Sequence, residues 1–201
     1  MMPSRSVRVG IFAAVLAGAC LLGADFSRPD PAGFALGTTT EQEIRQRFGE
    51  PEGQATAWVG DQLVTALRYT YSEVAANIVQ ARAMVYTFHD GRLVGFDYSS
   101  SFAADQTAFD ESTAKRIKRG QTTRADVLVL LGQPTGRFIY PSPYVTTPGR
   151  RTDVYSHSRS DKMPAEGTLE ATSKVLAVTF DERDVVVEIS LVVASSSKAL
   201  P

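Results

Sequence analysis

Residues 37–51 read GTTTEQEIRQRFGEP, and a similar pattern returns at residues 120–134 as GQTTRADVLVLLGQP. Two glycines, two threonines and a proline occupy the same positions in both stretches. Self-similarity of this kind indicates an internal duplication. We therefore expect the chain to contain two copies of one structural unit.

Each stretch predicts a short helix with marked ends. In the first copy, Thr39 or Thr40 is placed to cap the first turn, and Glu43 favours its positive end. Ile44 and Phe48 are four residues apart and form one apolar stripe, while Gly49 suits a C-terminal cap. The second copy has Thr122, Thr123, Asp126, Val127, Leu131 and Gly132 at the corresponding positions. A helix of about ten residues is marginal in isolation, so each copy must pack on something else.

Strand patterns follow each helix. In the first copy we expect strands at residues 63–71 and 82–88, then a turn containing Asp-Gly and a third strand at residues 92–99. In the second copy we expect strands at residues 152–157, 173–180 and 185–191. The sequence therefore predicts an α+β fold of two tandem modules, each with one or two short helices packed on an antiparallel three-stranded sheet.

Residues in both halves follow a known pattern. In the first half they are Gly37, Thr39, Ile44, Phe48, Gly49, Pro51, Phe88, Asp90 and Gly91. In the second half they are Gly120, Thr122, Val127, Leu131, Gly132, Pro134 and Phe180. This pattern resembles the SmpA/OmlA (BamE-like) lipoprotein domain, and the tandem arrangement over roughly residues 34–193 also resembles β-lactamase inhibitor proteins, which are built from two such modules.

The N-terminal segment predicts export and lipidation. Arg5 and Arg8 precede an apolar run that is too short to remain as a spanning helix, so residues 1–19 are expected to be a lipoprotein signal peptide. Small residues precede Cys20, the only cysteine, as in a bacterial lipobox. We predict that Cys20 carries the acyl chains, detectable as palmitate. The resemblance to lipoproteins implies that Leu21 after it, in place of an aspartate, favours the outer membrane over retention in the inner membrane. Cleavage by an ordinary signal peptidase, there or at Ala24, is the alternative.

The predicted organisation has five parts. They are the signal peptide (1–19), a tether (20–33), the first BamE-like module (34–103), the second (104–194) and a tail (195–201). Removing Arg5 and Arg8 leaves 19 basic residues against 22 acidic ones, a net charge near −3. That balance gives no reason to expect a nucleic-acid partner.

A positive cluster lies just before and within the second copy, where residues 110–119 predict an additional helix. Its members are Lys115, Arg116, Lys118, Arg119 and Arg124. A solvated helix face explains such a cluster, and so does binding to anionic lipid head groups or to an acidic partner.

The segment 135–151 predicts an unusual loop with three prolines and three aromatic residues, Phe138, Tyr140 and Tyr144. A semi-rigid aromatic loop suits a protein-contact surface, because little entropy is lost on binding. Packing back across its own sheet is the alternative. Trp58, in the corresponding loop of the first module, has the same two explanations.

The sequence gives little support for catalysis. His89 and His157 have no metal-ligating neighbour at a helical spacing, and no nucleophile or phosphate-loop motif is present. An acidic turn, made of Asp181, Glu182 and Asp184, is more typical of a solvated loop than of a calcium site. We therefore expect neither an enzyme nor a bound metal or cofactor.

Two functions remain from different classes. The first is a lipid-anchored envelope scaffold that binds an envelope protein, as the BamE-like resemblance implies for the machinery that inserts β-barrels into the outer membrane. The second is a soluble periplasmic or secreted binding or inhibitor protein that uses the concave face of a two-module sheet. A third and weaker alternative is an enzyme with an unusual acidic site.

Overall fold

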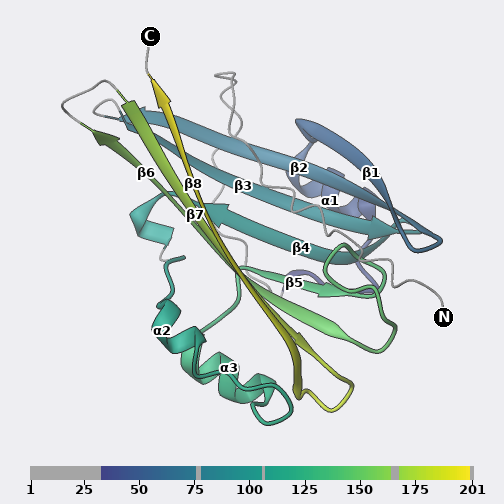
Figure 1. Ribbon diagram of the computed structural model, residues 1–201. Coiled ribbons are helices and arrows are strands. Elements are labelled where there is room, and N and C mark those ends of the chain that lie inside the picture. The colour runs from purple at the N-terminus through teal and green to yellow at the C-terminus, as the bar shows by residue number, and fades with distance from the viewer. Residues whose placement is uncertain (1–32, 76–77, 106, 164–167, 200–201) are drawn as a thin grey trace, which may run out of the picture.

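One antiparallel sheet runs through the whole structure (Figure 1). The computed structural model of the protein describes residues 33–75, 78–105, 107–163 and 168–199. Eight strands follow one another in chain order across the sheet. They are β1 (Gly53–Val59), β2 (Gln62–Ala75), β3 (Ile78–His89), β4 (Arg92–Ser100), β5 (Gly136–Ile139), β6 (Arg151–Met163), β7 (Thr168–Phe180) and β8 (Val186–Ala199).

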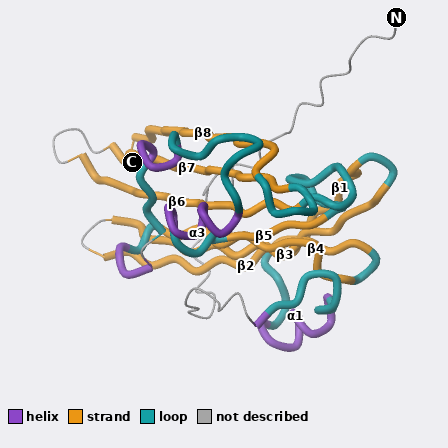
Figure 2. The backbone as a smooth tube through the Cα atoms, turned by 90° about the horizontal axis from the view of Figure 1, so that it is seen from below, coloured by secondary structure: helices purple, strands orange, loops and turns teal. Residues whose placement is uncertain are grey.

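The helices are short, and Figure 2 shows how small a part of the chain they occupy. They are α1 (Glu41–Phe48), α2 (Glu111–Ala114), α3 (Arg124–Leu131) and a 3₁₀ turn at Ala103–Asp105. The helix expected over residues 110–119 is thus only the single turn α2. None of the helices within the described ranges is long and apolar enough to cross a membrane.

α1 and α3 lie where the duplicated stretches predict them, and both begin with the same capping box. The Thr40 hydroxyl accepts a hydrogen bond from the Glu43 amide at 3.2 Å, and the Glu43 carboxylate accepts one from the Thr40 amide at 2.7 Å. Thr123 and Asp126 repeat this exchange at 3.2 and 2.9 Å. Reciprocal capping satisfies two amides that the helix itself leaves without partners, so each helix begins at a defined residue.

The two halves also attach their helices in the same way. The Tyr69 hydroxyl donates to the Gly49 carbonyl at 3.0 Å, and the Tyr155 hydroxyl donates to the Gly132 carbonyl at 3.1 Å. Each bond ties the C-terminal end of a helix to a strand of its own half. The duplication seen in the sequence is therefore repeated in three-dimensional contacts.

The prediction of two tandem modules, each with its own three-stranded sheet, is wrong, because the eight strands form one continuous sheet. Each half contributes four strands, because β1 and β5 lie in segments that were expected to be loops. β4 pairs with β5 and joins the halves into one sheet, through the pairs Gly95 with Phe138, Phe96 with Arg137, and Asp97 with Gly136.

Two glycines make this junction possible. A Cβ atom at Gly136 would lie 2.5 Å from the Phe96 carbonyl oxygen, and one at Gly95 would lie 1.9 Å from a ring carbon of Phe138. Both distances are far below van der Waals contact, so side chains at these positions would push the strands apart. In two of the three junction pairs, one of the two residues is therefore a glycine.

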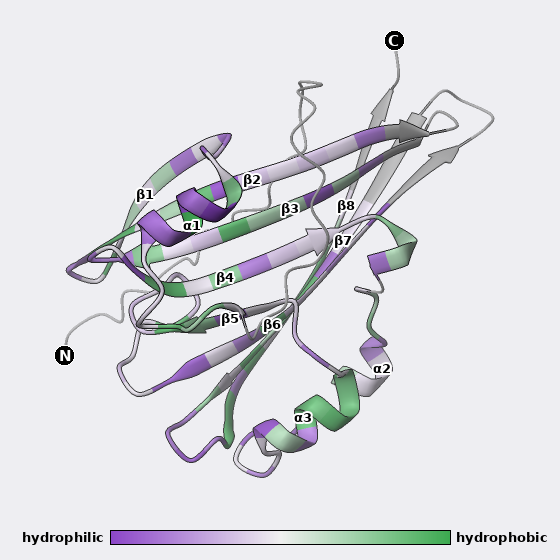
Figure 3. Cartoon of the chain, turned by 180° about the vertical axis from the view of Figure 1, so that it is seen from behind, coloured by the Kyte–Doolittle hydropathy of each residue, from purple (hydrophilic) through white to green (hydrophobic). Residues whose placement is uncertain are grey.

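All helices lie on one face of the sheet. Directly paired residues of an antiparallel sheet point to the same face, and the register runs from Phe96 to Arg137 and on to Asp153. Phe96 belongs to the core under α1, and Asp153 binds Arg124 of α3, so both helices share this face. Figure 3 looks onto it. The opposite side, which includes Asp97, Val154 and Ala177, is called the helix-free face below.

Three apolar clusters form the core. The cluster under α1 consists of Phe34, Ile44, Leu67, Tyr69, Met84, Tyr86, Phe88, Leu93, Phe96 and Tyr98. The cluster under α2 and α3 consists of Ala114, Ile117, Val127, Tyr155, Leu176, Val178, Phe180 and Val186. A smaller one on the helix-free face contains Phe138, Val145 and Val154. Each helix thus buries its apolar stripe against strands of its own half, as its length requires.

Candidate functional site

The hairpin between β1 and β2 presents the largest exposed aromatic side chain among the described residues. Trp58 is 70% exposed, and its cross-strand partner Leu63 is 45% exposed. A two-residue turn, Gly60-Asp61, closes the hairpin, and Gly60 has a φ of +65°. Glycine at this first turn position is typical of the type II′ turn, which matches the twist of two paired strands. The turn thus holds Trp58 and Leu63 side by side, and we call them the hairpin-tip pair.

The predicted aromatic loop packs back onto its own sheet. Phe138 is 3% exposed and lies in β5, and the ring of Tyr144 is centred 4.6 Å from its ring. Burial raises the pKa of the Tyr144 hydroxyl above its ordinary range. Tyr140 is half-buried against the same cluster. Of the two explanations for this loop, the structure thus favours packing for Phe138, while Tyr144 still borders a shallow groove with Val175 and Val192.

The predicted positive cluster is split by the fold. The side chains of Lys115, Arg116, Lys118 and Arg119 are exposed. Arg124 instead forms an ion pair with Asp153, with Nε and Oδ2 2.8 Å apart.

Asp153 is 2% exposed, and burial raises the pKa of its carboxyl group even though Arg124 opposes this shift. Arg124 is therefore a structural cation, and the surface available to an anionic partner is limited to the other four side chains.

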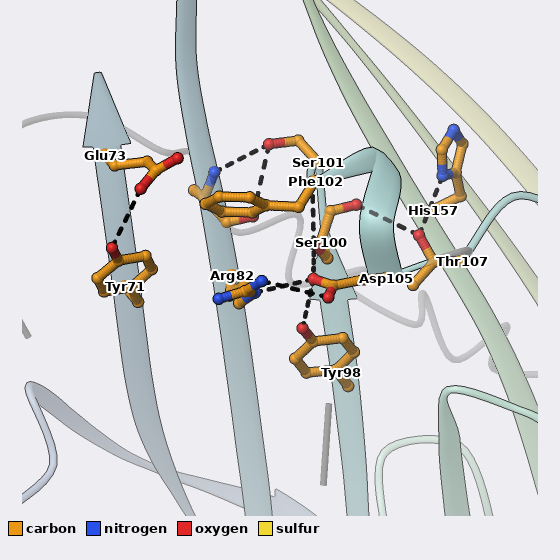
Figure 4. A network of polar contacts seen from close by, with 11 residues as sticks. Tyr71, Glu73, Arg82, Tyr98, Ser100, Ser101, Phe102, Asp105, Thr107 and His157 are labelled. Atoms are coloured by element: carbon orange, nitrogen blue, oxygen red, sulfur yellow. Dashed lines mark hydrogen bonds and ion pairs between the residues drawn. The ribbon is translucent and has the colours of Figure 1, made fainter. Parts of the chain in front are cut away.

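A polar network surrounds the 3₁₀ turn at Ala103–Asp105, which follows β4 on the helix face (Figure 4). Its centre is Asp105, which accepts hydrogen bonds from Arg82 at 2.8 Å, from Tyr98 at 2.7 Å and from Ser100. Burial disfavours the charged form of Asp105, but these hydrogen bonds outweigh it and lower the pKa. The Asp105 carboxylate therefore holds the connecting segment, which follows β4 and leads to the second half, against the sheet.

His157, one of the two histidines, belongs to the same network. Nδ1 of His157 lies 3.1 Å from the Thr107 hydroxyl, which in turn contacts the Ser100 carbonyl (Figure 4). Burial, with Lys174 and Arg159 nearby, lowers the pKa of His157 and favours the neutral ring. His157 thus helps to hold the connecting segment. The hydroxyl that it contacts, on Thr107, is buried.

Asp97 was not singled out from the sequence, yet it occupies the middle of the helix-free face. It is half-buried beside the junction of β4 and β5, and the Ser156 hydroxyl lies 2.9 and 3.1 Å from its two carboxylate oxygens. Burial raises its pKa to about 6, although hydrogen bonds from Ser156 and Thr135 oppose the shift. Alternation along β4 places Asp97 on this face, but only the pairing with β5 shows that it is half-buried.

The acidic turn is held by its own backbone amides and by Arg151. Asp181 accepts hydrogen bonds from the amides of Arg183 and Val185 at 3.0 and 2.9 Å, and Asp184 pairs with Arg151. Within residues 33–75, 78–105, 107–163 and 168–199, no three His, Cys, Asp or Glu side chains are grouped as for a metal ion. Cys20, the predicted lipidation site, lies outside the described residues.

Comparison with known proteins gives no family. No family model matches the sequence, and no curated protein matches it. Among solved structures, the crystal structure of a "putative beta-lactamase inhibitor protein" from Streptococcus mutans is similar, with 12% identity and a TM-score of 0.42. The similarity covers 80% of this chain and 91% of that one. Such a level of similarity assigns neither a family nor a function, so the BamE-like resemblance stays a prediction from the sequence.

Proposed function

We propose that this protein is a non-catalytic, exported binding protein that holds another envelope protein through the hairpin-tip pair. The observation that carries the proposal is the exposure of Trp58, at 70%, next to exposed Leu63. Single exposed apolar residues are common on protein surfaces, but tryptophan is strongly enriched among the residues that dominate binding energy. A rigid hairpin that presents one such residue loses little entropy when a partner covers it.

The proposal includes a lipid anchor at Cys20. Residues 20–33 would then tether the sheet to the membrane, which raises the effective concentration of the hairpin near envelope partners. The exposed cations Lys115, Arg116, Lys118 and Arg119 would strengthen attraction to anionic head groups. By resemblance to BamE-like proteins, the partner would belong to the machinery that assembles outer-membrane barrels.

The test is affinity capture from solubilised envelopes with the full-length protein and two variants. We expect Trp58→Ala to weaken binding by about 2 kcal/mol, or roughly thirtyfold, because a dominant interface aromatic is lost. The matched control is Val129→Ala, which removes an apolar side chain that is 87% exposed on α3. Equal capture by Trp58→Ala and the native protein would contradict the proposal.

A second candidate is a soluble inhibitor that binds through the helix-free face. The observation in its favour is the groove between Tyr144 and the side chains of Val175 and Val192 on that face. In this case Tyr144→Ala would reduce partner capture while Trp58→Ala would not. A cleaved protein without acyl chains in the soluble periplasmic fraction would also favour this candidate.

A further inference from the structure

The free edge of β1 is unusually unprotected. β1 is the first strand of the sheet and pairs only with β2 among the described strands. Its seven residues, GQATAWV, include no charged residue and no proline. Its register with β2 is regular from Gly53 to Val59, without a bulge. Exposed edges are normally blunted by charges, prolines or bulges, because their unpaired backbone groups attract other strands. β8, at the opposite edge, contains Glu188 and Lys198.

The backbone groups at this edge can be assigned from the hairpin. Val59 and Gln62 flank the two-residue turn, so they form a closely hydrogen-bonded pair. Hydrogen-bonded and non-bonded pairs alternate along an antiparallel ladder. The amides and carbonyls of Gln54, Thr56 and Trp58 therefore point away from β2, toward the free edge. These groups form half of a ladder that a further strand could complete.

We propose that the partner adds a strand to this edge: an extended, uncharged segment of a partner protein that carries Lys or Arg on both sides. This inference rests on the proposed function, because it specifies how the partner reaches the hairpin-tip pair. Strand addition supplies affinity through main-chain hydrogen bonds, and side chains next to the added strand supply specificity. Trp58 lies in the same stretch of edge, so an added strand would pass beside its ring.

The charges next to β1 indicate what kind of strand could pair with its free edge. Glu52 and Asp61 flank β1 at its two ends, both are exposed, and no described cation forms an ion pair with either. A second copy paired antiparallel about Thr56 would bring Glu52 of one copy next to Asp61 of the other. Like charges across such an interface are unfavourable. A strand with basic flanks instead places a cation at each end.

The binding test uses two synthetic peptides, each an alternating Thr-Val stretch of seven residues with two charged residues at each end. We expect the lysine-flanked peptide to bind at least about tenfold more tightly than the glutamate-flanked peptide at low salt, with the difference shrinking as salt is added. N-methylation of the amides along the peptide edge that faces β1 should abolish binding, because these amides then no longer donate hydrogen bonds to β1. No binding at millimolar concentration, or no effect of methylation on either edge, would overturn the proposal.

Two protein variants locate the site. Thr56→Pro removes an amide that points outward, so the sheet should survive while peptide binding falls at least about tenfold. Thr56→Val is the matched control, since it changes the side chain but keeps the amide, and its binding should stay within about twofold. If Thr56→Pro does not fold, the methylated peptides decide. Equal binding by a folded Thr56→Pro variant would overturn strand addition.

The outcomes separate this inference from the proposed function. If Trp58→Ala loses the envelope partner and a folded Thr56→Pro keeps it, strand addition is wrong and the proposed function stands. If both variants capture the partner normally, both proposals fail. Sedimentation of the native protein tests whether a second copy pairs with β1 instead. A dimer that dissociates in the Thr56→Pro variant would show that it does, which would overturn the proposal.

Discussion

The half-buried carboxyl group of Asp97 lowers the stability of the folded protein when it is ionised. Its ordinary pKa is near 3.8, and burial between the halves of the sheet raises it to about 6. Ser156 and Thr135 offset part of this cost by hydrogen bonding to the charged form. Well above pH 6 the group is ionised in both the folded and the unfolded chain, and the folded state bears the desolvation cost.

The raised pKa of Asp97 makes the stability of the protein fall as the pH rises. Between about pH 4 and pH 6 the folded protein binds more protons at Asp97 than the unfolded chain does, so this residue lowers stability as the pH rises. The loss reaches at most about 3 kcal/mol and is complete only when the pH is well above 6. Urea unfolding of the native protein and of Asp97→Asn across this range measures it. We expect the variant to gain relative stability as the pH rises; a difference that does not change with pH would contradict the prediction.

At the scale of elements, the capping boxes explain why the helices could be located from the sequence alone. The signal is local: a threonine, an acid three residues later, an apolar pair and a glycine lie within one short stretch. Strands β1 and β5 carry no comparable signal. β1 consists largely of small residues with low strand propensity, Gly53, Ala55 and Ala57. β5 has only four residues and is stabilised by pairing with β4, about forty positions earlier.

The capping residues have a measurable effect on stability. Thr123→Ala removes the hydroxyl that caps α3, and we expect a loss of about 1 kcal/mol in the free energy of unfolding. Thr40→Ala should cost a similar amount, because the same exchange caps α1. Thr123→Ser keeps the hydroxyl and should stay close to the native value. Chemical denaturation measures all three, and a Thr123→Ala variant as stable as the native protein would show that the capping box contributes nothing.

For the whole molecule, the junction between the halves is the feature that the sequence analysis could not supply. Gly95 does lie beside a register shift between β3 and β4, as a glycine within a strand indicates locally. Its role at the junction, like that of Gly136, depends on a strand that approaches from far along the chain. The same limit applies to Arg124, because its buried ion-pair partner, Asp153, lies 29 residues away. Local caps were therefore predictable, whereas the continuous sheet, the fate of the positive cluster and the partial burial of Asp97 were not.

The junction can be tested with a double-mutant cycle. Gly95→Ala places a Cβ atom 1.9 Å from the Phe138 ring, and we expect a loss of about 3 kcal/mol from overpacking. In a Phe138→Ala background the same substitution should cost much less, since the obstructing ring is gone. The difference between the two costs is the coupling energy. Additive effects in denaturant unfolding would show that the ring and the glycine do not constrain each other.

The pairing of β4 with β5 also has a consequence for how such a chain could arise. A solitary ancestral unit would have carried two bare edges, one equivalent to β1 and one equivalent to β4, and neighbouring molecules would have associated through them head to tail. Gene fusion of two units turns one of these associations into a covalently linked one. The contact then no longer depends on concentration, and the fused sheet keeps two edges, β1 and β8.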